Sequence, residues 1–278
     1  MRRYRYILFL LLVCGILGLS SFSTKERAEH YFEKICDLDN QCFISGEQLV
    51  YKIFYNWKFI WVPAGQVHFN IVETDSSYLV DVVDKTFSSY DSFFKVRDRY
   101  RTIIDKETLL PKSFLRDISQ GNYVRYDSMI IDQSNYEIRE YYGKSKETAK
   151  LNTYQLSNCT QDLLSILYHL RNRDISTIEK GSKMPVSFFF SKKHYELDVN
   201  IVDRKKKKIK GLGKYNVIHA RPELITGSVF DEDSYMDIYV SDDENKVPLM
   251  VESPLRIGTA KAVLLNHKNL KYELESLD

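Results

Sequence analysis

The chain has 278 residues, of which 44% are hydrophobic, 28% charged and 13% aromatic, with only 11 glycines and 6 prolines. These values are typical of a globular protein that is long enough to bury a sizeable core without metals or disulfides. The formal net charge of +2 is too small to support nucleic acid as a partner.

Residues 1–23 have the layout of an export signal, with basic MRRYR, apolar YILFLLLVCGILGL and the small residues SSFS. We expect cleavage after Ser23, which takes the 40 basic residues to 37 against 38 acidic ones. The alternatives are an uncleaved anchor, for which the apolar stretch is short, and a lipoprotein lipidated at Cys14, which Val13 disfavours. The sequence therefore predicts an exported protein, either periplasmic or associated with the outer membrane.

Three cysteines remain after cleavage, namely Cys36, Cys42 and Cys159. In an oxidising compartment we expect a disulfide between Cys36 and Cys42, which would close a small loop, although either of them could pair with Cys159 instead. No CxxC or Cys/His spacing is present, so we expect neither a metal nor a cofactor.

Strands are predicted for most of the chain. Residues 24–45 read as a short N-terminal helical segment, and from Gly46 onward the hydrophobic period changes to two. Short polar turns separate the segments, which favours antiparallel pairing. The candidate strands in the first half are 47–59, 64–73, 77–87, 94–105, 111–119, 122–132, 135–142 and 149–155.

One helix, TQDLLSILYHLRNRD at about 160–174, interrupts the strands, with Thr160 as the expected N-cap. Its apolar stripe is Leu163, Ile166, Leu167 and Leu170. Strands resume at 184–190, 194–203, 207–221, 234–241, 246–252 and 259–274. We therefore expect a mainly β protein, with residues 46–278 as a single domain of two sheet-rich halves around the helix. Its fold would be a large curved antiparallel sheet or a partly open β-barrel.

Catalytic signatures are absent from the sequence, which has no GxSxG, HExxH or glycine-rich phosphate loop. Asp162, Ser165 and His169 share one side of the predicted helix and supply the residue types of an acyl-transfer triad. Three residues on one helix face provide neither a serine held against the imidazole nor an oxyanion hole, so we interpret them as a polar helix face.

The segment YKIFYNWKFIW places Tyr51, Tyr55, Trp57 and Trp61 on one strand face, before an expected turn at VPAG. This face is interpreted either as the core of a curved sheet or as the wall of a cavity for an apolar or sugar ligand.

Basic residues alternate in KVRDRYR, where Lys95, Arg97, Arg99 and Arg101 share one face. They are candidates for binding an anionic ligand. The alternative is pairing with acids of neighbouring strands, which include Asp81, Asp84, Asp117 and Glu137.

A second basic run contains Lys205, Lys206, Lys207 and Lys208 and lies at a predicted hairpin turn. Lysines there protect an exposed sheet edge from aggregation, and contact with a membrane surface is the alternative.

The motifs GEQLVYKIFYNW, AGQVHF, VRDRYRTIIDKETLLP, QDLLSILYHLR and VPLMVESPLRIGTAKAVL occur in the order seen in a family of exported bacterial proteins. The chain resembles domain-of-unknown-function family 3108 over roughly residues 45–275. The resemblance implies an envelope β-protein and transfers no catalytic residue. We expect a non-enzymatic protein that binds or scaffolds envelope lipid or polysaccharide. The alternatives are a glycan hydrolase with carboxylates that no motif marks, and a structural partner in an envelope protein complex.

Overall fold

The computed structural model describes residues 38–57, 60–157, 159–175, 178–224, 235–255 and 258–277. The expected signal at 1–23 and most of the expected helical segment at 24–45 lie outside the described residues. Residues 38–45, the described part of that segment, contain no helix.

Fourteen strands make up one antiparallel sheet in the order β8-β7-β6-β5-β4-β3-β2-β1-β14-β13-β12-β11-β10-β9. The first eight are β1 Gln48–Trp57, β2 Ile60–Glu73, β3 Ser77–Thr86, β4 Arg97–Asp105, β5 Pro111–Gln120, β6 Tyr123–Asp132, β7 Glu137–Gly143 and β8 Lys150–Gln155. The others are β9 Lys183–Phe190, β10 Lys193–Ile209, β11 Gly213–Pro222, β12 Asp237–Ser241, β13 Pro248–Pro254 and β14 Thr259–Lys268. Two helices are described, α2 Ser88–Asp91 and α3 Ser165–Asn172.

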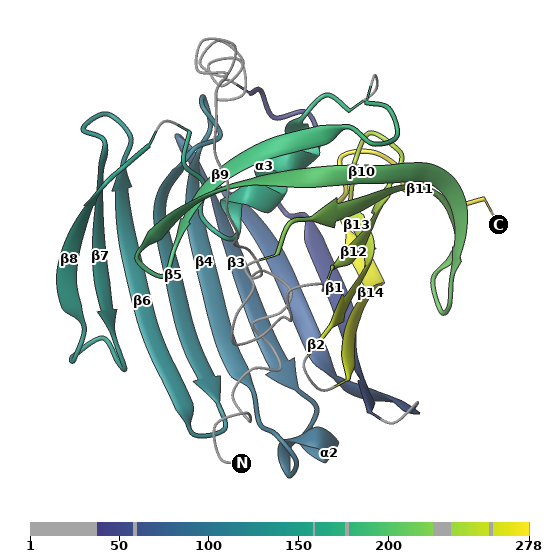
Figure 1. Ribbon diagram of the computed structural model, residues 1–278, viewed down its shortest axis with the longest axis horizontal. Helices are drawn as coiled ribbons and strands as arrows, with labels where there is room; N and C mark the ends of the chain where they lie inside the picture. Colours follow the sequence, from purple (N-terminus) through teal and green to yellow (C-terminus); the bar gives the residue numbers. More distant parts are fainter. Residues whose placement is uncertain are drawn as a thin grey trace.

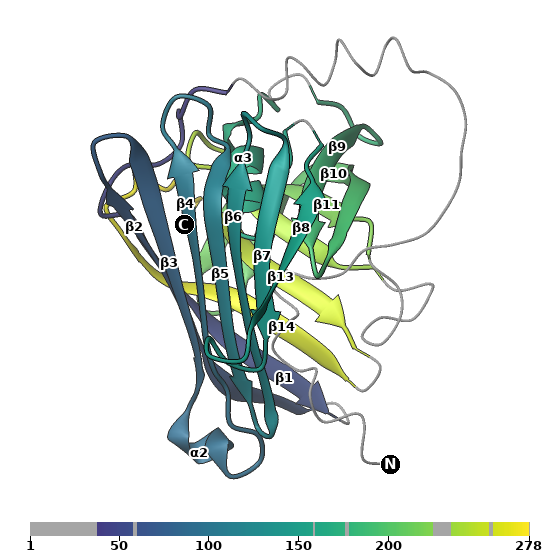
Figure 2. The ribbon, with the colours of Figure 1, turned by 90° about the vertical axis from the view of Figure 1, so that its left-hand side faces the viewer.

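The sheet is open, because its two outer strands, β8 and β9, are not hydrogen-bonded to each other as neighbours. Strands β2 to β8 form a long wall, and the strands from β14 to β9 curl over one face of it with α3 enclosed between them (Figures 1 and 2). The expected curved antiparallel sheet with few helices is therefore confirmed. The first and last strands of the chain, β1 and β14, are paired from Gln48↔Lys268 to Asn56↔Thr259 and join the two halves.

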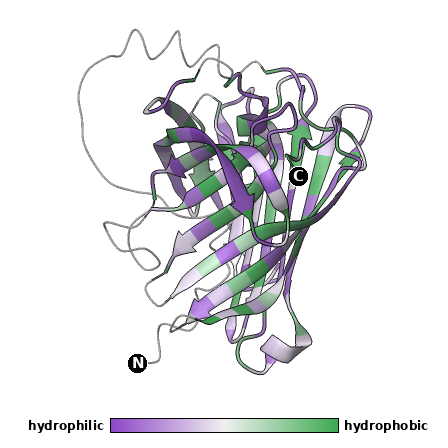
Figure 3. Ribbon diagram, turned by 90° about the vertical axis from the view of Figure 1, so that its right-hand side faces the viewer, coloured by the Kyte–Doolittle hydropathy of each residue, from purple (hydrophilic) through white to green (hydrophobic). Residues whose placement is uncertain are grey.

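Alternation of side chains along each strand explains why the sheet curves around a core. In β4 every second residue, from Asp98 to Ile104, is buried, whereas Arg97 and Arg99 are exposed. Hydrophilic and hydrophobic residues alternate in the same way along the strands in Figure 3. Burial of one face by the curled strands and α3 supplies the hydrophobic driving force for the fold.

Helix α3 is shorter than the predicted 160–174, because Asp162 forms its N-terminal turn. The Asp162 carboxylate accepts hydrogen bonds from the backbone N–H groups of Leu164 at 2.7 Å and Ser165 at 3.0 Å. The Ser165 hydroxyl in turn accepts from the Asp162 N–H at 2.8 Å, a reciprocal arrangement like that of a capping box. Thr160, the expected N-cap, instead donates to the Ser157 carbonyl at 2.7 Å.

The expected turn at VPAG is wrong, because this segment continues as strand β2. Its register with β1 shifts between the pairs Ile53↔Gly65 and Phe54↔Pro63. Ala64 is the extra, unpaired residue of a β-bulge, so the pairing of β1 with β2 shifts by one residue there and then continues.

This register separates two aromatic residues that the sequence placed on one face. Trp61 lies directly opposite Asn56, and Asn56 points to the other side of the sheet from Tyr55. The Trp57 side chain lies outside the described residues.

Gly65 is required where β2 and β3 approach closely. A Cβ atom at this position would lie 2.4 Å from the Lys85 carbonyl oxygen. We expect Gly65→Ala to lower the free energy of unfolding by about 1–3 kcal/mol in urea titrations, because the two backbones must move apart. Gly211→Ala is the control, since Gly211 has a φ of +83° but open space around its Cβ position. A smaller loss for Gly65→Ala than for Gly211→Ala would contradict the steric explanation.

The expected disulfide between Cys36 and Cys42 is wrong, since Cys42 has a free, buried thiol. Its Sγ donates to the Arg171 carbonyl at 2.8 Å and lies 3.6 Å from the Lys246 Nζ. Burial raises the pKa of this thiol. Cys159 is disulfide-bonded, and Cys36 lies outside the described residues.

Candidate functional site

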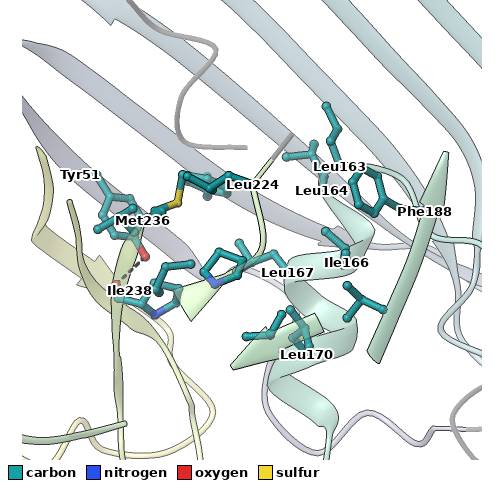
Figure 4. Close-up of a pocket in the computed structure, with 16 residues that line it drawn as sticks. Tyr51, Leu163, Leu164, Ile166, Leu167, Leu170, Phe188, Leu224, Met236 and Ile238 are labelled. Carbon is teal, nitrogen blue, oxygen red and sulfur yellow. Dashed lines mark hydrogen bonds between the residues drawn. The ribbon is translucent and has the colours of Figure 1, made fainter. Parts of the chain in front are cut away.

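An apolar cavity of about 150 Å³ lies between α3 and the curled part of the sheet (Figure 4). Residues from both halves of the chain line it: Tyr51, Phe69, Leu163, Leu164, Ile166, Leu167, Leu170, Val186, Phe188, Val199, Pro222, Leu224, Met236, Ile238, Pro248 and Val251. The lining contains no ionisable group except the Tyr51 phenol. Such a cavity excludes water and favours an apolar occupant.

The wall formed by α3 is the apolar stripe that the sequence predicted. Leu163, Ile166, Leu167 and Leu170 all line the cavity. Ile166, Leu167 and Leu170 are only partly buried, although they pack against the core. The helix therefore presents to the cavity a surface that the protein itself leaves incompletely covered.

Tyr51 contributes its ring to the cavity and directs its polar group elsewhere. The Tyr51 hydroxyl donates a hydrogen bond to the Pro248 carbonyl at 2.9 Å (Figure 4). Burial raises the pKa of the Tyr51 phenol, so the group stays neutral. The Tyr51 hydroxyl thus already has its hydrogen-bond acceptor within the protein, and it adds no unpaired donor to the lining.

A second cavity of about 90 Å³ continues along α3 and shares five lining residues with the first, namely Leu167, Leu170, Val199, Ile238 and Pro248. Arg171 and Lys246 are the charged residues among those that line it. The two cavities together follow the length of the helix from its first turn to its last.

A buried ion pair holds the C-terminal end of α3. The Arg171 guanidinium donates to both carboxylate oxygens of Glu47, at 2.6 Å and 2.8 Å, and both side chains are 2% exposed or less. It also donates to the backbone carbonyls of Asn245 at 3.0 Å and Cys42 at 3.1 Å. These bonds satisfy the buried charge and fix the helix against the sheet.

The residues that resembled a triad, Asp162 just before α3 and Ser165 and His169 within it, are buried and have structural partners. Asp162 accepts a hydrogen bond from the Thr102 hydroxyl at 2.5 Å, and burial raises the pKa of Asp162 to about 6. The His169 Nδ1 lies 3.4 Å from the Gln161 amide nitrogen, and burial lowers the pKa of His169 to about 3. Neither Asp162 nor His169 lines a described cavity.

The structure separates the four predicted aromatic residues. Tyr51 lines the cavity, and Tyr55 is buried on the same face of β1 without lining it. Trp61 is 37% exposed at the start of β2, where the Lys261 Nζ lies 4.0 Å from its ring centroid.

The predicted basic ladder faces outward, and three of its four residues are paired with acids. Arg97 binds Asp91 at 2.6 Å, whereas Arg99 and Arg101 share Asp81 at 2.8 Å and 2.7 Å. Pairing with acids of neighbouring strands was the alternative that the sequence left open. Of the acids named there, Asp81 pairs with the ladder, whereas Asp84 is buried on the other face of β3. The fourth residue, Lys95, is exposed before β4. A role for the ladder in binding an anionic ligand stays a prediction.

The prediction that the run of four lysines lies at a hairpin turn is wrong, because the run is part of strand β10 and the turn to β11 follows Ile209. Lys205 lies 3.1 Å from Asp203, and the Lys207 Nζ lies 3.9 Å from the Tyr239 ring centroid. Lys206 and Lys208 are exposed. Membrane contact through this run stays a prediction.

Two pairs of buried acids lie on the inner face of the wall, and no sequence motif marks either pair. Asp84 and Asp98 face each other across β3 and β4. Burial, reinforced by the charge of Asp98, raises the pKa of Asp84 well above its usual range, and burial raises the pKa of Asp98 to about 6. The only signal in the sequence was a charged residue at an inward position of an alternating strand.

The second pair, Asp127 and Glu140, lies where the β9–β10 turn reaches the wall. Arg116 binds Asp127 at 3.0 Å and its guanidinium carbon lies 4.4 Å from the Phe190 ring centroid. Burial, followed by repulsion from Asp127, raises the pKa of Glu140 to about 7. Neither acid pair lines a described cavity.

Neither a metal-binding cluster nor a membrane-spanning helix occurs in the part of the chain that the structure describes. No group of three or more His, Cys, Asp or Glu side chains is arranged to hold a metal ion. No helix in the same residues has the length and hydrophobicity needed to cross a bilayer.

An open, strongly curved antiparallel sheet that wraps around a short helix places the protein in the class of β-barrel-like folds. The chain belongs to the family described as "Protein of unknown function (DUF3108)", whose model matches residues 50–265. The resemblance seen in the sequence motifs is thereby confirmed.

Two solved structures are similar to the chain, and the first of them supports the fold. The chain is similar to a β-barrel-like protein of domain of unknown function DUF1849 from Brucella abortus, with 10% identity over 84% of this chain and 100% of that chain, and a TM-score of 0.57. A putative exported protein with a YmcC-like fold from Bacteroides fragilis matches with 11% identity over 84% of this chain and 100% of that chain, with a TM-score of 0.29. No curated protein matches the chain.

Proposed function

We propose that the protein is a non-enzymatic, exported binding protein that holds an acyl chain of an envelope lipid in the cavity along α3. The observation that carries this proposal is the apolar cavity of about 150 Å³, continued by a second of about 90 Å³. Cavities for drug-sized ligands measure about 300–1,000 Å³, so the space suits a single chain better than a whole lipid.

Lipid is favoured over polysaccharide by the chemistry of the lining. Sugar hydroxyls buried against leucine, valine and phenylalanine side chains would lose their hydrogen bonds to water without replacement. A hydrolase is disfavoured because the two acid pairs on the wall lie outside the lining of both cavities.

Blocking the cavity tests the proposal. Leu167 lines both cavities and is only partly buried, so Leu167→Trp adds bulk at their junction with a moderate cost to folding. We expect binding of a fluorescent fatty acid to weaken by about tenfold or more, because each tenfold corresponds to about 1.4 kcal/mol of lost contact.

Ile130→Trp is the matched control, since Ile130 is 40% exposed on β6 and far from the lining residues in the sheet. Native mass spectrometry of the purified protein would show whether a lipid co-purifies. Saturable fatty-acid binding that Leu167→Trp leaves unchanged, in a variant with the circular dichroism of the parent protein, would rule out this cavity as the site.

A further inference from the structure

One end of the molecule is formed by a hairpin that projects beyond its neighbouring strand. Strand β2 begins at Ile60, but its pairing with β3 begins only at Gly65, opposite Thr86. At about 3.3 Å per residue, the four residues before Ala64 extend about 13 Å further. Three of them are large and exposed: Ile60 at 65%, Trp61 at 37% and Val62 at 41%.

Another exposed apolar residue, Phe93, lies at the same end. Helix α2 follows β3 there (Figures 1 and 2), and the Phe87 N–H donates to the Ala64 carbonyl at 3.0 Å. Phe93, just after α2, is 56% exposed, and its ring packs edge-on against the buried Tyr90 at 5.3 Å. The aromatic ring is thus held outward on a fixed support.

Basic residues lie at the same end of the molecule as these apolar side chains. Lys85, opposite Arg97 in the β3–β4 pair, and Lys95 are both exposed. Lys261 lies over the Trp61 ring. The acids nearby are already paired, Asp91 with Arg97 and Glu252 with Lys261, so the lysines give this end a positive charge.

We propose that this end of the protein docks on the surface of a lipid bilayer that carries anionic head groups. Exposed apolar residues in a continuous stretch mark an interaction site. Tryptophan beside lysine is the combination that suits the boundary between head groups and acyl chains. Lysine side chains at a membrane surface add attraction to anionic lipids. A protein partner would not require this combination of an apolar tip with a basic rim.

The docking end is defined by Ile60, Trp61, Val62, Phe93, Lys85 and Lys95. It consists of other residues than the lysine run of β10, a strand separated from β2 in the sheet by β1, β14, β13, β12 and β11. Lys207 of that run is close enough to Lys261 and Glu252 to interact with their charges. The proposal does not depend on ligand binding in the cavity, because none of the six residues lines it.

Vesicle flotation tests the proposal. The probe is a set of vesicles of phosphatidylcholine alone or with about a third phosphatidylglycerol. We expect binding to the anionic vesicles that weakens with added salt, and a loss of at least tenfold in the partition coefficient for a Trp61→Ser, Phe93→Ser double variant. Lys85→Glu with Lys95→Glu should give a similar loss on anionic vesicles only.

Matched controls come from exposed apolar residues at the opposite end of the wall. Val72 is 53% exposed near the end of β2, and Tyr136 is 51% exposed in the β6–β7 turn. Val72→Ser with Tyr136→Ser should leave binding unchanged. All variants keep the same N-terminal residues, so the apolar stretch near the start of the chain contributes equally to each.

Three outcomes would overturn the proposal. The first is absence of binding to anionic vesicles. The second is an equal loss in the control double variant. The third is full binding by the Trp61→Ser, Phe93→Ser variant together with loss in a Lys206→Glu, Lys208→Glu variant, which would place the contact on β10. Circular dichroism of every variant separates lost binding from lost folding.

Discussion

Replacing Arg171 with methionine is expected to lower the free energy of unfolding by about 3–5 kcal/mol. The substitution leaves the Glu47 carboxylate buried without its bidentate partner, and it removes the donors to the carbonyls of Asn245 and Cys42. Because Arg171 is the last charged residue of α3, the loss also frees the helix end from the sheet. Urea denaturation followed by circular dichroism measures the change.

Two comparisons make the result specific. Lys183→Met removes an exposed pair with Asp198, whose lysine side chain is 57% exposed, and should cost less than about 1 kcal/mol. A Glu47→Gln, Arg171→Met double variant should lose less than the sum of the single variants, because no unpaired charge remains. A loss of under about 1 kcal/mol for Arg171→Met alone would show that the buried pair does not stabilise the fold.

Asp84→Asn is expected to make the protein progressively more stable than the parent as the pH rises above about 4. Burial raises the pKa of Asp84 in the folded state, so the folded protein holds a proton that the unfolded chain releases. The protonated Asp84 makes its full contribution to the free energy of unfolding below its pKa in the unfolded chain, about 4. That contribution is lost as the pH rises towards its pKa in the folded protein. Asparagine resembles the protonated acid and removes this loss, so the stability difference between the variant and the parent should grow as the pH rises from 4 to 7.

Asp81→Asn should show the opposite dependence. The guanidinium groups of Arg99 and Arg101 hold the pKa of Asp81 below its usual range despite its partial burial. Its contribution is present above the unfolded pKa and is lost as the pH falls through the folded pKa. The variant should therefore be less stable than the parent at pH 7 and converge with it in acid. A difference in free energy of unfolding between Asp84→Asn and the parent that stays constant from pH 4 to 8 would contradict a buried, protonated Asp84.

The cavity and the docking end occupy different parts of the molecule, which allows them to be tested separately. The cavity follows α3, whereas the docking end is at the start of β2 and beside α2. Loss of fatty-acid binding in Leu167→Trp with vesicle binding retained would separate the two functions. If both proposals hold, an acyl chain would be carried by a protein that contacts the membrane directly.

The sequence by itself determined the class of fold and the wall of the cavity on α3. Alternation with a period of two predicted the strands, because one buried face of a sheet selects apolar residues at every second position. The helical spacing of Leu163, Ile166, Leu167 and Leu170 identified the side of α3 that faces the cavity. The ordered motifs identified the family.

Only the tertiary structure decided which distant residues meet. The pairing of β1 with β14 brings Tyr51 to Pro248, and the chain positions of these residues give no sign of that contact. The bulge at Ala64 lets β2 continue through VPAG to the hairpin end where Trp61 lies. It also reverses the face of residues 60–63 relative to the rest of β2, since a one-residue change in register moves side chains to the other side of the sheet. Local patterns report the period of a strand, but the curvature that encloses a cavity arises from contacts between strands far apart in the chain.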